Sequence, residues 1–289
     1  MTIKIILAPV SGSDHDTVTL ATAFLIAHDF DAHVDVLFAR RPPSDAVPMV
    51  GEGVSATMVE QLMESAAQEW ERRESDARRA FEAAVHGFGV SKHDVPPGPG
   101  TVTAAWRVAD GREDEVVTRA SQLSDLLVLG NEPAGSSDAQ LTVTLESALF
   151  RGGRPLLLAP ATPPREIGRA VAIAWNGSVE VARAVAGALP LLHRATDVHI
   201  LTAATRKTDP SVAGPLADYL AWHGILATPR RLDPGGDPVG GVLLAAASDL
   251  GADLMVMGGY SHSRLRELIL GGVTRFVLAQ AGIPILMSH

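Results

Sequence analysis

A glycine-rich segment near the end of the chain contains the residues best suited to bind an anion. Its key residues are Met257, Gly258, Ser261, Gly271, Gly272, Val273 and Thr274. Glycine lets backbone N–H groups approach an anion closely, and the apolar spacing after Gly272 predicts a helix with its N-terminus at the same place. The pattern therefore predicts a phosphate-binding loop, with hydroxyl donors from Ser261 and Thr274.

Short apolar runs without alternation predict the elements that position this loop. They lie at residues 3–9, 34–39, 126–130, 155–159, 170–175, 198–203, 254–258 and 284–287. Such runs are typical of strands that are buried on both faces of a parallel sheet. Amphipathic helical patterns lie between them, so we expect an α/β fold in which helices cover both faces of the sheet.

The sequence also repeats itself. Gly12-Ser13 recurs as Gly177-Ser178, and the run at 125–130 recurs at 253–258. The proline-rich segment 160–165 separates the two copies, because proline continues neither a helix nor a strand ladder. We therefore expect two domains, at residues 1–160 and 166–289, each with about five strands.

The first copy is longer than the second between residues 40 and 100. This insertion contains a long helical pattern in which apolar residues recur in register. They are Val54, Met58, Leu62, Ala66 and Trp70. The regularity predicts a helix within residues 53–88 that covers part of the first domain or mediates association between chains.

The glycine-rich segment has the spacing of a known nucleotide-binding loop. Gly258, Ser261, Gly271 and Gly272 occupy the positions of the Gly-x2-Gly-x9-Gly-Ser/Thr motif of the universal stress protein family. Ser261 replaces the second glycine, and Gly272 replaces the Ser/Thr. The chain resembles that family in its tandem two-domain form, and the resemblance covers the whole length.

The resemblance implies a fold and a ligand. The fold would be two tandem, doubly wound, Rossmann-like domains, each a parallel five-stranded sheet of order 3-2-1-4-5, with the fifth strands packed together. The ligand would be an adenine nucleotide such as ATP, bound in the second domain. Its implied site comprises Trp175, Asn176 and Leu201 around the base, Met257 and Gly258 at the ribose, and Ser261, Gly271, Gly272, Val273 and Thr274 at the phosphates.

The first copy lacks these features. Ser11 stands where the second copy has Asn176, and Thr142 and Val143 stand where it has Gly271 and Gly272. We therefore expect no phosphate loop in the first domain.

Composition excludes several classes of protein. The net charge is -9 with no dense Lys/Arg stripe, which argues against binding to nucleic acid or to an anionic membrane surface. The chain has no cysteine, which excludes thiolate nucleophiles and Cys-ligated metals. No apolar run approaches the roughly 20 residues of a membrane span, so we expect a cytoplasmic protein.

Three hypotheses of function remain open. The first is a nucleotide-binding stress or signalling protein without catalysis, and the second is a nucleotide-independent protein of the same fold that acts by dimerisation and partner contacts. The third, a nucleotide-processing enzyme, lacks a visible base or a carboxylate cluster for Mg²⁺. Asp14, His15 and Asp16 favour a helix start over a metal site, and His199 and His223 are isolated.

Overall fold

Parallel strands form the framework of the protein, as described by a computed structural model. The structure describes residues 2–46, 55–96, 98, 100–131, 139–205, 210–259 and 272–289. In the first half the elements are β1 (Ile5–Val10), α1 (Asp16–Phe30), β2 (His33–Arg40), η1 (Pro43–Ala46), α2 (Ala56–Phe88), β3 (Ser91–Lys92), β4 (Thr103–Asp110), α3 (Glu113–Ser121), β5 (Leu126–Leu129), α4 (Ala139–Arg151) and β6 (Leu156–Leu158).

The second half repeats this alternation. Its elements are β7 (Ala170–Ala174), α5 (Val179–Leu192), β8 (Asp197–Ala203), η2 (Pro210–Val212), α6 (Ala213–Trp222), β9 (Ala227–Leu232), α7 (Val239–Asp249), β10 (Leu254–Gly258), α8 (Gly272–Gln280) and β11 (Ile285–Ser288). The apolar runs found in the sequence coincide with eight of these strands, within one or two residues at each end.

The strand order confirms the expected topology. The order is β4-β2-β1-β5-β6 in the first half and β9-β8-β7-β10-β11 in the second, which is 3-2-1-4-5 in both. The short strand β3 adds an outer edge to the first half. The strands within each half are parallel, and the two fifth strands, β6 and β11, pair antiparallel with Leu157 opposite Leu286. Within the described residues, the halves thus share one 11-stranded sheet. The limits 1–160 and 166–289 for separate domains stay a prediction.

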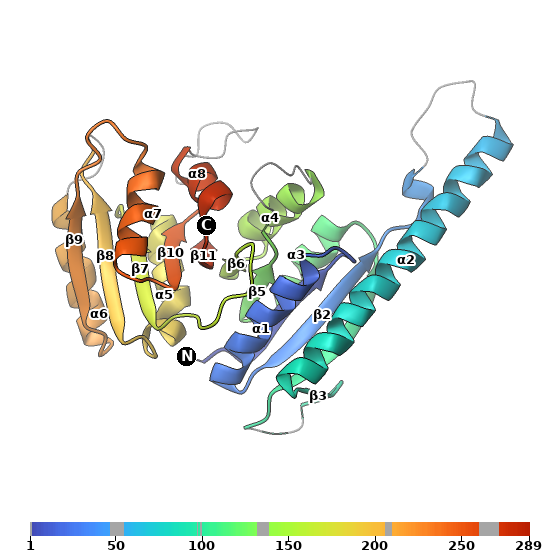
Figure 1. Cartoon of the computed structure of the whole chain (residues 1–289), viewed down its shortest axis with the longest axis horizontal. Helices are drawn as coiled ribbons and strands as arrows, with labels where there is room; N and C mark the ends of the chain where they lie inside the picture. The colour runs from blue at the N-terminus through green and yellow to red at the C-terminus, as the bar shows by residue number, and fades with distance from the viewer. Residues whose placement is uncertain are drawn as a thin grey trace.

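Helices cover both faces of this sheet, as Figure 1 shows. Buried residues of α1, α2, α5 and α6 form one apolar layer with one face of the strands. Those of α3, α4, α7 and α8 form a second layer with the other face. Each layer contains side chains from both halves, so the apolar core continues across the antiparallel junction.

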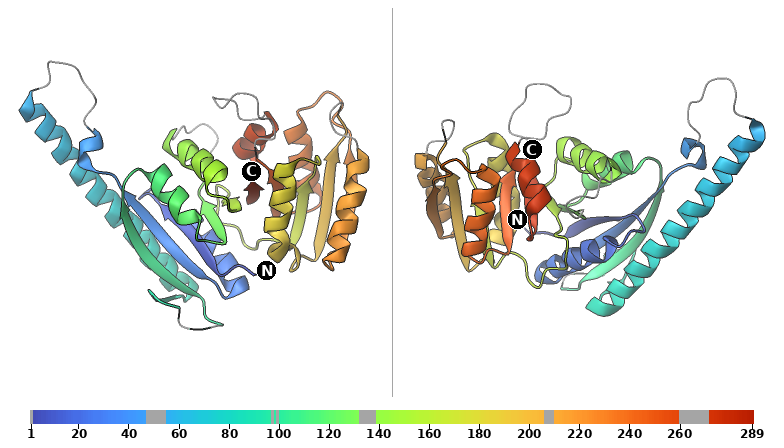
Figure 2. Two further views of the ribbon diagram at one scale, coloured as in Figure 1. Left: turned by 180° about the vertical axis from the view of Figure 1, so that it is seen from behind. Right: turned by 45° about the horizontal axis from the view of Figure 1, so that its top comes forward.

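Helix α2 is the helix predicted in the insertion of the first copy. Ser55 caps its N-terminus by accepting a hydrogen bond from the Met58 N–H, and Gly89 ends it in a left-handed conformation. Ala77, Phe81 and Val85 are buried against the first half, which confirms that the helix covers it. The N-terminal part of α2, where Met58 is exposed, projects beyond the body in both views of Figure 2. Association between chains through this part stays a prediction.

The search for apolar runs missed the third strand of each half, β4 and β9. Both lie at or next to an outer edge of the sheet, and both are polar along much of their length. Arg107 and Asp110 on β4, and Arg230 and Arg231 on β9, are exposed. A strand with a free edge needs no continuous apolar run, and charged residues there discourage pairing with other chains.

Candidate functional site

The strand ends that carry the predicted base-binding residues lie side by side at the carboxyl edge of the sheet, whereas Trp175 packs with one apolar layer and Leu201 with the other. The strand register places Ala174 of β7 beside Leu201 of β8 and Met257 of β10. The Trp175 N–H continues the ladder by donating to the Leu201 carbonyl oxygen at 2.9 Å. The strand order reverses at β7, because β8 and β9 lie on one side of β7 in the sheet and β10 and β11 lie on its other side. Ligands of such folds bind at the carboxyl edge, where the order reverses.

The turn after β7 presents Asn176 to solvent. The Asn176 Oδ1 accepts a hydrogen bond from the Ser178 N–H at 3.0 Å, and Gly177 has a φ of 75°. Ser178 then caps α5 by accepting from the Val181 N–H at 3.4 Å. Since the Asn176 oxygen is held by the turn, its exposed amide can still donate through Nδ2.

The side chain of Trp175 is held at this edge of the sheet by a hydrogen bond and by packing. Its Nε1–H donates to the Val212 carbonyl oxygen at 2.9 Å. The half-buried indole packs against the apolar layer that includes α5 and α6. It thereby ties the end of β7 to η2 and the start of α6.

Gly258 serves close packing between β10 and α5. A Cβ at this position would lie 2.7 Å from the Val181 nitrogen and 3.0 Å from the Glu180 Cβ, so only glycine fits without a shift. Gly130, its counterpart in the first half, approaches α1 in the same way, since an added Cβ would lie 2.9 Å from the Thr19 Oγ1. A packing role therefore explains both glycines without a ligand.

Helix α8 begins at Gly272, as the sequence predicted. Gly272 is exposed, and an added Cβ there would meet no atom of the described residues within 4 Å. Val273 is half-buried and Thr274 is only 5 % exposed, which leaves little of the Thr274 hydroxyl accessible. The first N–H groups of any α-helix lack partners within the helix and can donate to an anion. The predicted Ser261 and Gly271 lie outside the described residues.

In the first half, the side chain of Asp16 occupies the corresponding turn. The carboxylate of Asp16 accepts hydrogen bonds from the Ser11 N–H at 3.0 Å and from the Gly12 N–H at 2.8 Å. Asp16 is 3 % exposed, and burial raises its pKa to about 6 despite these two hydrogen bonds. The second half has Val181 at the matching place, so the counterpart of Asp16 there is not a carboxylate.

Helix α2 also passes over this turn of the first half. A Cβ on Gly12 would overlap the Arg73 carbonyl oxygen and would lie 2.7 Å from the Arg73 Cα. Gly12 has a φ of 79°, which glycine adopts without strain. The backbone of α2 is therefore in direct contact with the turn after β1.

The helix start predicted at Asp14, His15 and Asp16 is confirmed, because α1 begins at Asp16, but Asp16 also has a second role. Asp16 is the first residue of α1, but its carboxylate bonds backwards to the turn, and the N-cap residue His15 makes no side-chain cap hydrogen bond. Sequence reasoning missed this role. The available signal was an Asp four residues after Gly12, which lies two residues past the end of a strand. Within the described ranges, no group of three His, Asp or Glu side chains is arranged to hold a metal ion.

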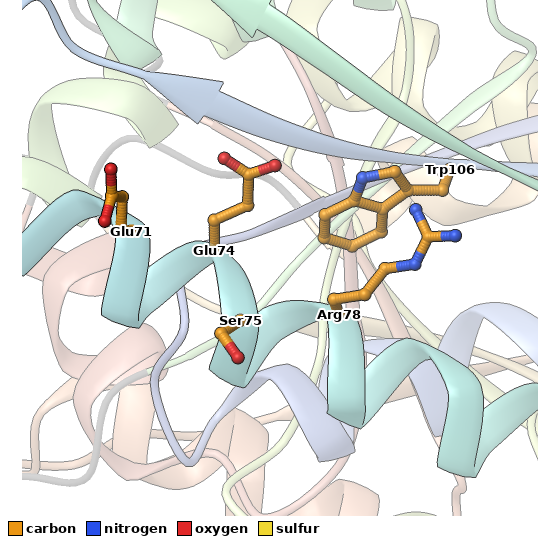
Figure 3. A pocket seen from close by; sticks show the side chains of 5 residues that line it. All are labelled: Glu71, Glu74, Ser75, Arg78 and Trp106. Carbon is orange, nitrogen blue, oxygen red and sulfur yellow. The ribbon is translucent and has the colours of Figure 1, made fainter.

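A cavity of about 390 Å³ lies elsewhere, between α2 and β4 of the first half. Figure 3 shows Glu71, Glu74, Ser75 and Arg78 along α2 beside Trp106. Glu74 is paired with Arg40 at 2.7 Å, and the Arg78 guanidinium lies 5.1 Å from the Trp106 ring centroid. Trp106 pairs with Val36 in the middle of β2, so this cavity is not at the carboxyl edge.

Comparisons with known proteins agree with this architecture. The model of the universal stress protein family matches residues 230–289, which include α7, β10, α8 and β11. A universal stress protein from Archaeoglobus fulgidus is 14% identical with a TM-score of 0.68, and the match covers 98% of this chain and 97% of that one. A protein of unknown function from Pseudomonas aeruginosa PAO1 is 15% identical with a TM-score of 0.55, and the match covers 98% of this chain and 92% of that one.

No curated protein matches the sequence. Among the described helices, none is both long and apolar enough to cross a bilayer. Residues 230–289 thus match the universal stress protein family and the whole chain has the tandem fold of a universal stress protein, which confirms the predicted resemblance.

Proposed function

We propose that the second half binds an adenine nucleotide such as ATP, and that the protein acts in the cytoplasm as a stress-response or signalling protein without catalysing a reaction. The observation that carries the proposal is the N-terminus of α8 at Gly272, where an added Cβ would meet no atom of the described residues within 4 Å. In a βαβ unit, the helix after β10 starts at the carboxyl edge, where Trp175, Leu201 and Met257 also lie. Phosphates at the α8 N-terminus and a base near Asn176 suit this arrangement.

The contrast between the halves supports a single site. The Ser11 and Gly12 N–H groups already donate to Asp16, and α2 lies against Gly12. A nucleotide in the first half would have to displace both a buried carboxylate and a helix. Among the described residues of the second half, neither obstacle lies at Asn176 and Gly177. We therefore assign the nucleotide to the second half alone.

Substitutions at Gly272 test the proposal, because an added Cβ there would meet no atom of the described residues within 4 Å. Gly272→Asp places a negative charge at the start of α8, where it favours the helix but repels phosphate. Gly272→Asn is its matched control, since the two side chains have the same shape and differ in charge. We expect ATP affinity, measured by titration calorimetry, to fall about 10- to 100-fold in Gly272→Asp relative to Gly272→Asn.

Thermal unfolding separates lost binding from lost structure. Gly272→Asp should unfold at or slightly above the temperature of Gly272→Asn, because an acidic residue stabilises a helix N-terminus. Equal affinity in the two variants would mean that the ligand sits elsewhere. A wild-type protein that binds neither ATP nor ADP at millimolar concentration would refute nucleotide binding.

A specific observation favours the second candidate, a nucleotide-independent interaction protein. Gly272 offers no hydroxyl, and Thr274 is nearly buried, so the site has fewer phosphate donors than the family motif supplies. In that case partner contacts would carry the function. Mass analysis of small molecules released from the purified protein distinguishes the two candidates, and incubation with Mg²⁺ and ATP tests for turnover.

A further inference from the structure

Asn131 of the first half contacts α8, the helix whose N-terminus belongs to the candidate site. It follows β5 and Gly130 in the first half, and its Nδ2 donates to the Leu278 carbonyl oxygen at 3.0 Å. Leu278 belongs to α8 in the second half, 147 residues further along the chain. Because the acceptor is a carbonyl oxygen, the amide must present its nitrogen.

The Leu278 carbonyl lies in the last turn of α8, where the final four C=O groups have no partner within the helix. The Val277 carbonyl oxygen accepts from the Ala281 N–H at 2.8 Å. No basic side chain lies in the last turn of this helix to satisfy the others. Asn131 therefore acts as a C-terminal cap that comes from the other half of the protein.

Helix α8 has little support of its own. It has nine residues, of which only Thr274 and Val277 are buried. Isolated helices of this length are marginal in water, so tertiary contacts decide its position. Phe276 provides one contact, against Gly240 of α7, where an added Cβ would lie 3.0 Å from the ring. The Asn131 cap provides another, at the end of the helix farthest from Gly272.

We propose that Asn131 is a positioning residue for the nucleotide site of the second half. By holding the C-terminal end of α8, it fixes the direction in which the N–H groups near Gly272 point. The first half, in which Asp16 occupies the turn after β1, thus helps to hold the site of the second half in position. This inference rests on the proposed nucleotide binding.

A second link between the halves provides a control. The Arg194 guanidinium pairs with Asp29 at 2.6 Å, near the C-terminal ends of α5 and α1 and therefore at the amino edge of the sheet. Asp29→Asn weakens contact between the halves without touching α8. Loss of Asn131 acts on α8 itself. Comparing the two variants separates a specific cap from general loosening of the junction.

The experiment measures ATP affinity by calorimetry and hydrogen exchange of the α8 amides in the full chain. Asn131→Ala should weaken ATP binding about 2- to 10-fold, the effect of one neutral hydrogen bond, and should speed exchange in α8. Asn131→Asp should weaken it at least as much, because a carboxylate cannot donate to a carbonyl. Asn131→Gln should restore both readouts in part, and Asp29→Asn should change neither.

Two results would overturn the inference while leaving nucleotide binding intact. One is faster exchange in Asn131→Ala with unchanged ATP affinity, which would make Asn131 a cap without a role in the site. The other is an equal effect of Asp29→Asn, which would mean general loosening. A wild-type protein that binds no ATP would instead refute the proposed function, and this inference with it.

Discussion

The buried carboxyl group of Asp16 should make stability depend on pH. Burial raises its pKa from 3.8 to about 6 in the folded protein, so between these values the folded state binds a proton that the unfolded state has released. The free energy of unfolding therefore falls as pH rises through this window. A pKa shift of one unit corresponds to about 1.4 kcal/mol, so ionised Asp16 costs roughly 3 kcal/mol at neutral pH.

Asp16→Asn tests this magnitude because it keeps the shape of the side chain and removes its titration. We expect urea unfolding to show that the wild type loses about 2 to 3 kcal/mol relative to Asp16→Asn between pH 4 and pH 7. Above pH 7 the difference should stay constant. Asp14→Asn, at an exposed position two residues away, should follow the wild type.

Two outcomes would contradict the reasoning. A difference between wild type and Asp16→Asn that does not change with pH would show that Asp16 does not titrate in this range. A difference of opposite sign, with the wild type gaining stability as pH rises, would mean that the hydrogen bonds from Ser11 and Gly12 outweigh burial. The turn would then be an anion site that Asp16 fills at a net gain.

Two further predictions concern α2. Phe81→Ala should lower the free energy of unfolding by about 3 to 5 kcal/mol, because Phe81 is fully buried. Leu62→Ala, on the projecting part of α2, should lower it by at most about 0.5 kcal/mol. Similar urea midpoints for the two variants would show that α2 is not packed as described. Gly12→Ala should lower the free energy of unfolding by about 2 kcal/mol or more beyond the effect of Gly89→Ala. Both glycines have a positive φ, but only Gly12 lies against Arg73. Equal effects of the two substitutions on urea unfolding would mean that α2 does not lie against the turn.

Local patterns in the sequence were enough to predict the repeated α/β architecture. A strand buried on both faces must be apolar at every position, so residues 126–130 and 254–258 reveal both the strands and their repetition. The helix starting at Gly272 was equally visible, because a glycine pair precedes an apolar helical pattern. The resemblance to universal stress proteins supplied the strand order, which is a property of the whole fold.

Strands and contacts that depend on distant partners were not visible in this way. Strands β4 and β9 have polar, partly exposed sequences because an outer strand needs no apolar run. The close packing of Gly258 and the burial of Thr274 were also not visible, since a motif records residue type and spacing but not burial. Gly258 packs against α5, and Thr274 has turned into the core.

The sequence by itself determined that this chain folds as two similar halves and that the second half carries the glycine-rich segment. Only the tertiary structure showed that the turn after β1 in the first half is occupied by other parts of the protein. Asp16 bonds to the turn after β1, Arg73 of α2 lies against Gly12, and Asn131 reaches Leu278 across 147 residues. Periodicity reports how a residue relates to its own helix or strand, whereas these contacts depend on how separate elements pack together.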